Sequence, residues 1–401
     1  MSASTTAAPA TPSTNILQPF TGQQQATNDN ASALLRQSYG KRFFQPIANG
    51  SFTPVYGQPT IINVPLNPVG LITKFVVEVQ TTVTNPSSGS TLTRGSFGPF
   101  STFSLISYTD PAQNNRIQTT GYHLAMVNAR RRRRVPGSSV TTDSPTGFGA
   151  TLAPIAAPST IAANATGTVS AVYEIPLSYG RNTLKGAVFA GAVFATQNLQ
   201  LTFNPNFAQN SADPLGAVYT GASNANPPTY STTWRVYQEY WDQFPLQLLT
   251  ALSPDLSTVY ELKQTAITSL LANNDNYIRF NNLRQFMSTS LFFDNGGSLN
   301  AGTDINYFLL QSANQTIIWK KYIQEFGYET ANLLGDNPPA GCYMFDFTEA
   351  PIITAAEGNT VLSLNPNLVN SNATIYIGWE DLATSSVLAS ASSLAGTAGV
   401  G

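Results

Sequence analysis

Apolar and polar residues alternate along much of the chain from residue 51 onward. The clearest example is the stretch 71–83, where Phe75, Val77 and Val79 place apolar side chains at every second position. A period of two is typical of a β-strand with one buried face. Shorter runs of apolar residues, bounded by glycine, proline or asparagine, predict further strands. These are residues 103–108, 122–127, 168–177, 199–203, 234–241, 277–280, 286–293, 341–347 and 374–379.

Two segments instead have the spacing of three or four residues that is typical of a helix. Residues 31–44 follow Asn30, a favoured capping residue, and predict a short helix near the N-terminus. Residues 254–271 place Leu256 and Val259 on one side and predict a helical connector.

Three landmarks recur in the same order in the two halves of the chain. They are Ser104-Leu105-Ile106 with Ser290-Leu291-Phe292, the run 201–207 with 362–368, and Val236-Tyr237 with Ile375-Tyr376. The second landmark contains Asn-Pro-Asn after a predicted strand, a combination that favours a turn. The first two landmarks lie 96 residues apart in the first half and 71 in the second. Loops absorb such a difference at small entropic cost, so the order indicates an internal duplication.

Each copy supplies about eight short strands with long loops, which fits a jelly-roll sandwich. We therefore predict an all-β fold of two tandem eight-stranded jelly-roll barrels, with a short N-terminal helix and short connector helices. The expected divisions are an arm with a short helix at 1–48, the first jelly roll at 49–247, the second with its helical connector at 248–384, and a tail at 385–401.

Charged residues are scarce in this chain. Asp, Glu, Lys and Arg make up 10% of it, whereas soluble domains contain about 25%. The formal net charge is −2, so the molecule as a whole has no electrostatic attraction for nucleic acid. Two explanations stay open: a β-rich protein with uncharged loops, or a protein whose flanks are buried against copies of itself, because interface cores are poor in charge.

Few residues offer catalytic or metal-binding chemistry. His123 is the only histidine and Cys342 the only cysteine, which excludes a multi-histidine metal site and an intrachain disulfide. We expect His123 to be a structural residue at a strand end, with Asn306 in its place in the second copy. Counting alone leaves open a Ser-His-Asp arrangement with Asp110 or Asp143, but no nucleophile elbow is present. We expect Cys342 to be a buried small hydrophobe.

The stretch Asp294-Asn295-Gly296-Gly297 is interpreted as a tight turn. Together with Asn300 and Asp304 it contains oxygen ligands, but the spacing is not that of a calcium loop. The chain has no phosphate-binding glycine loop. The sequence therefore predicts no cofactor and no enzymatic activity.

The N-terminus predicts neither a secretory signal nor a membrane span. It has no basic region followed by a continuous apolar one, and no run in the chain approaches the ~18 apolar residues of a spanning helix. Residues 1–30 are rich in Ala, Thr, Ser, Pro, Gln and Asn, so we expect a poorly packed arm. Any membrane contact would then be peripheral.

Several segments resemble the major capsid protein of tectiviruses, the icosahedral double-stranded DNA bacteriophages with an internal lipid membrane. They are TTDSP at 141–145, APSTIAA at 157–163, PLSY at 176–179, LKGAV at 184–188, FDNGGS at 293–298 and NAGTDINY at 300–307. The resemblance is collinear from about Ser32 to Trp379. The arm before Asn30 and the arginines that follow Ala129 have no recognised counterpart.

This resemblance implies a double jelly-roll subunit of the hexon-like kind. Its homotrimers would form pseudo-hexameric capsomers that tile an icosahedral shell around an internal membrane. Implied partners are the chain itself, neighbouring trimers, minor capsid and vertex proteins, and the viral membrane by peripheral contact, with no direct nucleic acid. The subunit would be soluble in the host cytoplasm before it joins the virion. The segment expected nearest the membrane contains Leu34, Leu35, Arg36, Lys41 and Arg42.

Five consecutive arginines, Arg130, Arg131, Arg132, Arg133 and Arg134, hold five of the 19 basic charges. Mutual repulsion makes such a run costly unless it is solvated or meets anions. A solvated loop is one interpretation, and contact with acidic groups of a neighbouring subunit or minor protein is another. Contact of the arginines with lipid phosphate or DNA is the least favoured interpretation. Replacing the run with serine is expected to leave folding unchanged and to weaken assembly.

Two other functions remain as alternatives. An extracellular two-domain jelly roll could bind carbohydrate through exposed aromatic residues such as Trp234, Tyr237, Trp241 or Trp379. A cupin-type enzyme would need clustered metal-binding histidines, which one histidine cannot supply. The missing signal peptide and disulfides count against the first alternative.

Overall fold

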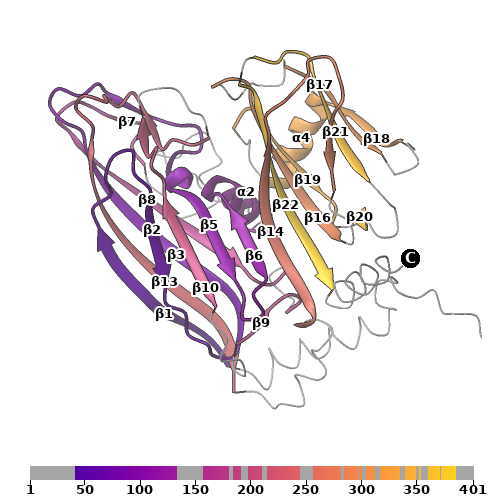
Figure 1. Cartoon of the computed structure of the whole chain (residues 1–401), viewed down its shortest axis with the longest axis horizontal. Coiled ribbons are helices and arrows are strands. Elements are labelled where there is room, and N and C mark those ends of the chain that lie inside the picture. The colour runs from indigo at the N-terminus through magenta and orange to yellow at the C-terminus, as the bar shows by residue number, and fades with distance from the viewer. Residues whose placement is uncertain are drawn as a thin grey trace, which may run out of the picture.

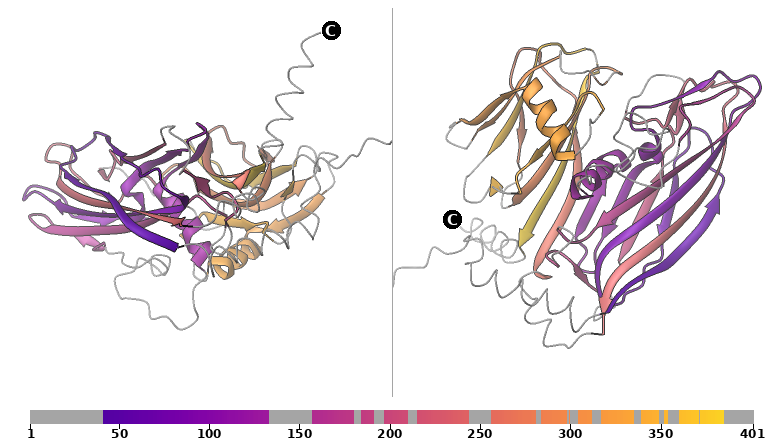
Figure 2. Two further views of the ribbon diagram at one scale, coloured as in Figure 1. Left: turned by 90° about the horizontal axis from the view of Figure 1, so that it is seen from below. Right: turned by 180° about the vertical axis from the view of Figure 1, so that it is seen from behind.

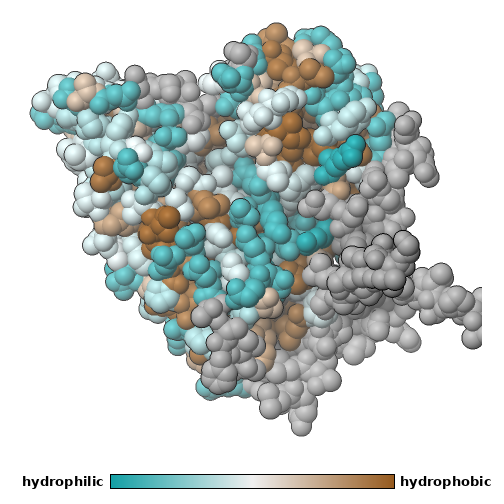
Figure 3. Space-filling view, viewed as in Figure 1, coloured by the Kyte–Doolittle hydropathy of each residue, from teal (hydrophilic) through white to brown (hydrophobic). Residues whose placement is uncertain are grey.

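The computed structural model describes residues 41–132, 157–179, 184–190, 197–209, 215–243, 256–280, 284–297, 299, 304–311, 317–334, 339–348, 352–353, 360–370 and 372–384. Within these ranges β-strands predominate and form two barrels that lie side by side (Figure 1). Figure 3 shows that the face seen in Figure 1 is a mosaic of apolar patches and polar surface.

The first barrel consists of two facing sheets. One contains, in spatial order, β1 (Lys41–Phe52), β13 (Thr229–Asp242), β3 (Leu71–Thr84) and β8 (Thr166–Pro176), with β9 (Val188–Phe189) also pairing with β3. The other contains β2 (Thr60–Val64), β10 (Asn198–Phe203), β5 (Phe103–Thr109) and β6 (Asn115–Thr119). Counting these eight main strands along the chain, the orders are 1-8-3-6 and 2-7-4-5, which is the jelly-roll arrangement.

The second barrel repeats this arrangement. Its first sheet runs β14 (Thr258–Ile267), β22 (Thr374–Thr384), β16 (Gln285–Asp294) and β19 (Cys342–Asp346), with β20 (Ile352–Ile353) beside β16. Its second sheet runs β15 (Asn276–Arg279), β21 (Val361–Pro366), β17 (Ile305–Gln311) and β18 (Ile317–Tyr322). The orders are again 1-8-3-6 and 2-7-4-5, so the duplication is present in three dimensions.

A helix occupies the same place in each barrel. Helix α2 (Gly121–Arg132) follows β6, and helix α4 (Ile323–Leu334) follows β18. Figure 2 shows both helices on the same side of the molecule. In the first barrel a 3-10 helix, η2 (Gly98–Thr102), packs beside α2. A small sheet of β11 (Ala208–Gln209), β12 (Tyr219–Thr220), β4 (Leu92–Arg94) and β7 (Thr160–Ile161) closes one end of that barrel.

A single nine-stranded sheet joins the two barrels. Strand β6 at the edge of the first barrel pairs in parallel with β14 at the edge of the second, with Ile117 opposite Leu262. The core of the first barrel continues over α2 onto the outer face of the sheet β14-β22-β16-β19, where Leu262 and Phe292 belong to it. The second barrel has its own core, built around aromatic residues such as Phe308 and Phe345. Burial of these shared apolar side chains therefore fixes the position of one barrel relative to the other.

Two predicted elements are wrong in type. Residues 122–127, predicted as a strand, belong to helix α2, because an apolar run of six residues does not distinguish a buried strand from a buried helix. The helical connector predicted at 254–271 is strand β14 over Thr258–Ile267, and residues 251–255 lie outside the described residues. The first five residues of β14 are buried on both faces, which hides its period of two. The boundary expected at residue 48 falls inside β1.

The matching of the two copies is partly corrected by the strand order. The second and third landmarks fall on equivalent strands, β10 with β21 and β13 with β22. The first does not, because Ser104-Leu105-Ile106 lies on the fourth strand of its barrel and Ser290-Leu291-Phe292 on the third. The Ser-Leu-Ile motif of the first barrel was therefore matched to a strand one position before its true equivalent in the second barrel.

Candidate functional site

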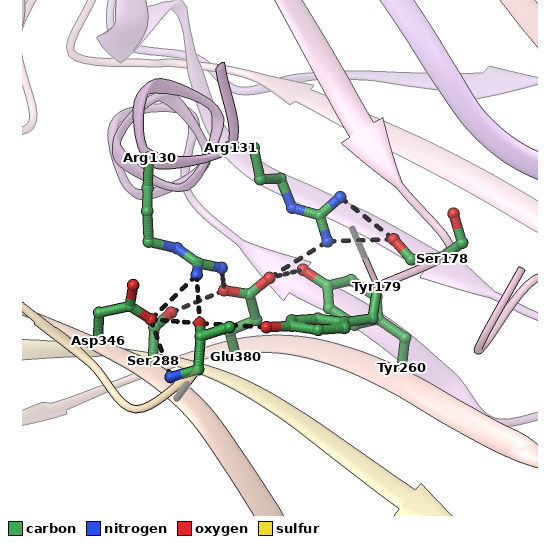
Figure 4. Close-up of polar contacts among 9 residues, drawn as sticks. Arg130, Arg131, Ser178, Tyr179, Tyr260, Ser288, Asp346 and Glu380 are labelled. Atoms are coloured by element: carbon green, nitrogen blue, oxygen red, sulfur yellow. Dashed lines mark hydrogen bonds and ion pairs between the residues drawn. The ribbon is translucent and has the colours of Figure 1, made fainter. Parts of the chain in front are cut away.

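The joint between the barrels contains a buried cluster of charged side chains. The last turn of α2 brings Arg130 and Arg131 against Glu380 on β22 (Figure 4). Glu380 is 1% exposed, and the side chains of Arg130 and Arg131 are 8% and 9% exposed. Arg130 also donates to the Asp346 carboxylate at 3.2 Å. Two buried cations of the first barrel thus meet two carboxylates of the second.

Hydrogen bonds complete the surroundings of the Glu380 carboxylate. The Tyr260 hydroxyl donates to Oε1 at 2.9 Å, and the Ser288 hydroxyl donates to Oε2 at 2.7 Å. On the other side, both terminal nitrogens of Arg131 donate to the Ser178 carbonyl at 3.1 Å. The Arg131 guanidinium also lies 5.0 Å from the centre of the Tyr260 ring. These bonds satisfy the buried carboxylate, whereas the Nε atoms of Arg130 and Arg131 are buried without a hydrogen-bond partner.

The charges of Glu380 and Arg130 stay fixed at neutral pH. Burial would raise the pKa of Glu380, but the guanidinium groups of Arg130 and Arg131 and the bonds from Ser288 and Tyr260 lower it to about 2. Burial would lower the pKa of Arg130, yet Glu380 and Asp346 raise it above its usual value. The cluster is therefore a permanent electrostatic contact between the barrels, not a proton-transfer site.

A second acidic group lies one residue further along β22. Asp381 is 2% exposed and stands opposite Glu261 of β14 in the strand register. Arg284 bridges them, at 2.9 Å from Glu261 and 3.4 Å from Asp381, and Lys263 contacts Glu261 at 2.6 Å. Burial raises the pKa of Asp381 to about 7; Arg284 and Lys263 oppose this, while Glu261 and Glu380 add to it. This residue is the titratable group of the joint.

His123 lies in α2 and not at a strand end. It is 1% exposed, and its Nδ1 is 2.6 Å from the Thr119 hydroxyl. Its ring packs so closely on Gly378 of β22 that a Cβ added to this glycine would lie 2.0 Å from Nε2. Burial lowers the pKa of His123 to about 3, although Glu380 raises it, so the ring is neutral and serves packing. The predicted equivalence with Asn306 is wrong, because Asn306 lies on β17.

The five arginines do not share one environment in the structure. The interpretation as a solvated loop does not hold for Arg130 and Arg131, whose anionic partners belong to the same chain. Arg132 is the last residue of α2, and Arg133 and Arg134 lie outside the described residues. An anionic partner from another molecule stays a prediction for these three.

Only some of the residues predicted to lie near the membrane are described by the structure. Leu34, Leu35 and Arg36 lie outside the described residues, whereas Lys41 and Arg42 are exposed at the start of strand β1 and are not helical. Arg42 forms an ion pair with Glu239.

The remaining predictions concern single residues of the second barrel and the aromatic side chains. The turn after β16 is present, with the Gly297 amide donating to Asp294 at 2.7 Å. Cys342 is buried at 2% exposure, as expected. Trp241 and Trp379 are at most 9% exposed, which removes them as carbohydrate-stacking residues.

Glu380, Glu261 and Asp381 were not predicted from the sequence as site residues. A signal was present, because Glu380-Asp381 puts one acidic group on each face of a strand that is otherwise apolar. With few charged residues available, adjacent acids in a strand indicate a buried cation partner.

The fold and this joint define a class of protein. The structure is similar to that of the STIV MCP, with a TM-score of 0.61, 10% identity, and coverage of 86% of this chain and 97% of that one. It is likewise similar to a chain in the atomic structure of Sulfolobus Turreted Icosahedral Virus, with a TM-score of 0.60, 12% identity, and coverage of 86% and 91%. The fold is thus that of the double jelly-roll capsid proteins of viruses.

The sequence comparisons identify the family. Residues 22–244 match the N-terminal model of the P3 major capsid protein, and residues 257–396 match its C-terminal model. The chain is 35% identical over 382 residues to the major capsid protein P3 of Enterobacteria phage PRD1, covering 93% of this chain and 96% of the relative. The chain therefore belongs to the P3 major capsid protein family. It is a major capsid protein of the virion, with a structural and not an enzymatic role.

Proposed function

We propose that three copies of this chain form a closed trimer, and that such trimers tile an icosahedral shell. The carrying observation is that both barrels have the same strand order and the same helix, and are joined edge to edge. A chain of this kind is one third of a ring of six similar barrels. Closed rings are the usual outcome of such head-to-tail contacts.

Native mass tests this proposal. Light scattering of the purified chain at micromolar concentration is expected to give three times the chain mass of 42.9 kDa. A monomer under these conditions would refute the proposal. Electron microscopy of the trimer is expected to show a nearly hexagonal outline, because three subunits present six barrels.

A second part of the proposal concerns the inner face of the shell. The segment with Leu34 and Leu35 is proposed to contact an internal viral membrane peripherally, and the subunit is proposed to be soluble in the host cytoplasm before assembly. In support, no described helix is long and apolar enough to cross a membrane. Flotation with anionic vesicles is expected to recover the trimer, and the variant Leu34→Ser/Leu35→Ser is expected to stay at the bottom. Equal flotation of both would contradict this contact.

Minor capsid and vertex proteins are the proposed partners of Arg132, Arg133 and Arg134. Since Arg130 and Arg131 are occupied within the chain, the test uses Arg132→Ser/Arg133→Ser/Arg134→Ser. The triple variant is expected to form normal trimers and to give fewer complete particles than the wild type at low salt. A normal particle yield across a salt series would remove this role.

The division of the chain into an arm, two jelly rolls and a tail remains part of the proposal. The family models end at residue 244 and resume at 257, which supports the boundary near residue 248. Strand β1 supports starting the first barrel at Lys41 and not at residue 49. The proposed tail from 385 lies outside the described residues.

A further inference from the structure

A buried asparagine follows the third strand of each barrel. Asn85 comes directly after β3 and is 2% exposed, and Asn295 comes directly after β16 and is 0% exposed. In the first barrel the side-chain amide of Asn85 donates hydrogen bonds of 2.8–3.1 Å to the backbone carbonyls of Ser90, Ile161 and Ala162. Buried polar groups are hydrogen-bonded in native proteins, and here the bonds tie the end of β3 to the segment around β7.

Asn295 ties three segments of the second barrel together. Its Nδ2 donates to the Asp304 carboxylate at 2.6 Å and to the Leu368 carbonyl at 3.3 Å. Its Oδ1 accepts from the backbone amide of Asn370 at 2.7 Å, and the Asn370 side chain donates to the Asn295 carbonyl at 2.9 Å. Asn295, Asp304, Leu368 and Asn370 form a junction that we call the Asn295 corner. Both polar atoms of the Asn295 side chain are used in it.

The two asparagines differ in the residue that comes next. The side-chain carbonyl carbon of an asparagine is open to attack by the backbone nitrogen of the following residue. Glycine favours this reaction, because it has no Cβ to hinder the approach and allows more backbone conformations. Gly296 follows Asn295, whereas Pro86 follows Asn85, and the nitrogen of a proline carries no proton to lose. The same position is therefore reactive in the second barrel and inert in the first.

The folded corner holds this reaction back. The Asn295 amide nitrogen, which has to leave, is bonded to Asp304 and Leu368, and the residue is fully buried. Attack by Gly296 turns the Asn295 side chain toward its own backbone, so these bonds have to break first. The reaction thus needs a local opening, whose population is set by the free energy of that opening.

The product does not fit back into the corner. Asp304 is 4% exposed, and one of its oxygens lies 2.6 Å from the Asn295 amide nitrogen. Replacing that nitrogen by oxygen turns a hydrogen-bond donor into a second carboxyl group. Two buried carboxyl groups at hydrogen-bond distance cannot both be ionised, so one of them has to take up a proton or move away.

We propose that Asn295 is a covalent modification site that reacts only when the Asn295 corner opens, and that its product keeps the corner from closing. The Gly296 nitrogen attacks Cγ of Asn295 and forms a new N–C bond, which closes a succinimide ring. The C–N bond of the side-chain amide breaks, and the proton of the Gly296 nitrogen leaves with that amide as ammonia. Water then opens the ring to aspartate or isoaspartate. Water is the only other reactant, so the reaction is independent of the trimer.

Modification makes the opening of the corner irreversible. An open corner closes again as long as Asn295 is intact, whereas a modified corner brings a second carboxyl group against Asp304. Opening is thereby converted from an equilibrium into a permanent change, which limits the operational lifetime of a protein. The turn requires the reactive pair, because Gly296 has a φ of 76°, where a residue with a Cβ would be strained.

Peptide mass spectrometry tests whether Asn295 is such a site. The folded protein and the same protein unfolded in guanidinium chloride are incubated in mildly alkaline buffer, and conversion of amide to carboxyl is followed with time. Conversion at Asn295 is expected in the unfolded protein, and it is expected to be ~100-fold slower or more in the folded one, because few corners are open at any moment. Equal rates in the two samples would overturn the protection by the corner.

Two other asparagines serve as matched controls. Asn49, which precedes Gly50, is expected to convert in the unfolded protein as Asn295 does. Asn85, which precedes Pro86, is expected to stay intact in both samples. An unfolded protein that converts at Asn49 and not at Asn295 would overturn the modification site itself.

The variant Asn295→Asp tests the second part of the proposal, because it places the carboxyl group of the product beside Asp304. Hydrogen exchange of residues 293–297 and 304–311 is expected to rise, and the thermal midpoint is expected to fall. In Asn295→Asp/Asp304→Asn the amide and the carboxylate change places, so the hydrogen bond is kept with its direction reversed. This double variant is expected to return both measurements close to the wild-type values.

The double variant separates a defect of facing carboxyl groups from a general one. Wild-type exchange in Asn295→Asp would show that the product does not hold the corner open. A double variant as defective as the single one would also overturn this part, because the defect would not then come from two carboxyl groups. The comparison holds even where Asn295→Asp does not fold, since a folded double variant then supports the proposal and an unfolded one contradicts it.

Discussion

Neutralising Glu380 is expected to destabilise the protein strongly. In Glu380→Gln the shape is kept, but Arg130 and Arg131 lose the carboxylate that both contact inside the joint. The folded-state pKa of about 2, against an ordinary value of 4.5, corresponds to roughly 3 kcal/mol of net stabilisation of the ionised form. Removal of one partner from a buried pair costs about 3–5 kcal/mol in other proteins, which agrees with this magnitude.

Urea unfolding at pH 7, followed by tryptophan fluorescence, measures this loss. Asp346→Asn is the matched control, because the Asp346 side chain is 22% exposed and contacts only one of the two arginines, Arg130. It is expected to cost about 1 kcal/mol or less. A loss below about 1 kcal/mol for Glu380→Gln, or equal losses in the two variants, would refute the reasoning.

The pH dependence of the same comparison gives a further check. A carboxylate with a lowered pKa stabilises the fold fully above its unfolded pKa, and this contribution disappears as the pH falls through the folded value. The difference between wild type and Glu380→Gln should therefore shrink as the pH falls from about 5 toward 2. A constant difference down to pH 2 would contradict the assignment.

The remaining predictions concern the groups around this cluster. Because the pKa of Asp381 is raised from 3.8 to about 7, the folded state keeps a proton that the unfolded state loses, and stability should fall by up to about 4 kcal/mol between pH 4 and pH 7. Asp381→Asn should remove this slope from urea midpoints, and an unchanged slope would falsify the assignment. Gly378→Ala should cost about 1–3 kcal/mol, because the new methyl group overlaps the His123 ring. Gly327→Ala in α4, where nothing lies within 4 Å, should instead gain up to about 1 kcal/mol, and similar thermal midpoints for the two alanine variants would exclude this packing argument.

Much of the fold followed from local pattern. The period of two identified β3 with nearly correct bounds, because its odd-numbered residues face a core and its even-numbered residues face outward. The Asn-Pro-Asn turns marked equivalent strands, since β10 ends just before its turn and β21 ends at Pro366 within its turn. Where both faces of an element are buried, as in α2 and the start of β14, the pattern carried no period, and those two elements were assigned wrongly.

The candidate site was less accessible to sequence reasoning. The electrostatic repulsion within the arginine run could be recognised from the sequence. The carboxylate that neutralises Arg130 and Arg131, however, belongs to Glu380, which lies 250 residues from Arg130. Nothing local in the sequence links these positions. Only the parallel pairing of β6 with β14, which sets the second barrel against α2, brings them together.

The late position of Glu380 in the chain also bears on synthesis. During translation α2 emerges with two cations whose shared carboxylate, Glu380, is supplied only when β22, the last described strand, has been made and inserted between β14 and β16. The first barrel therefore reaches its final packing only when the end of the second barrel has been made. A chain that ends before residue 380 would lack the carboxylate that Arg130 and Arg131 share.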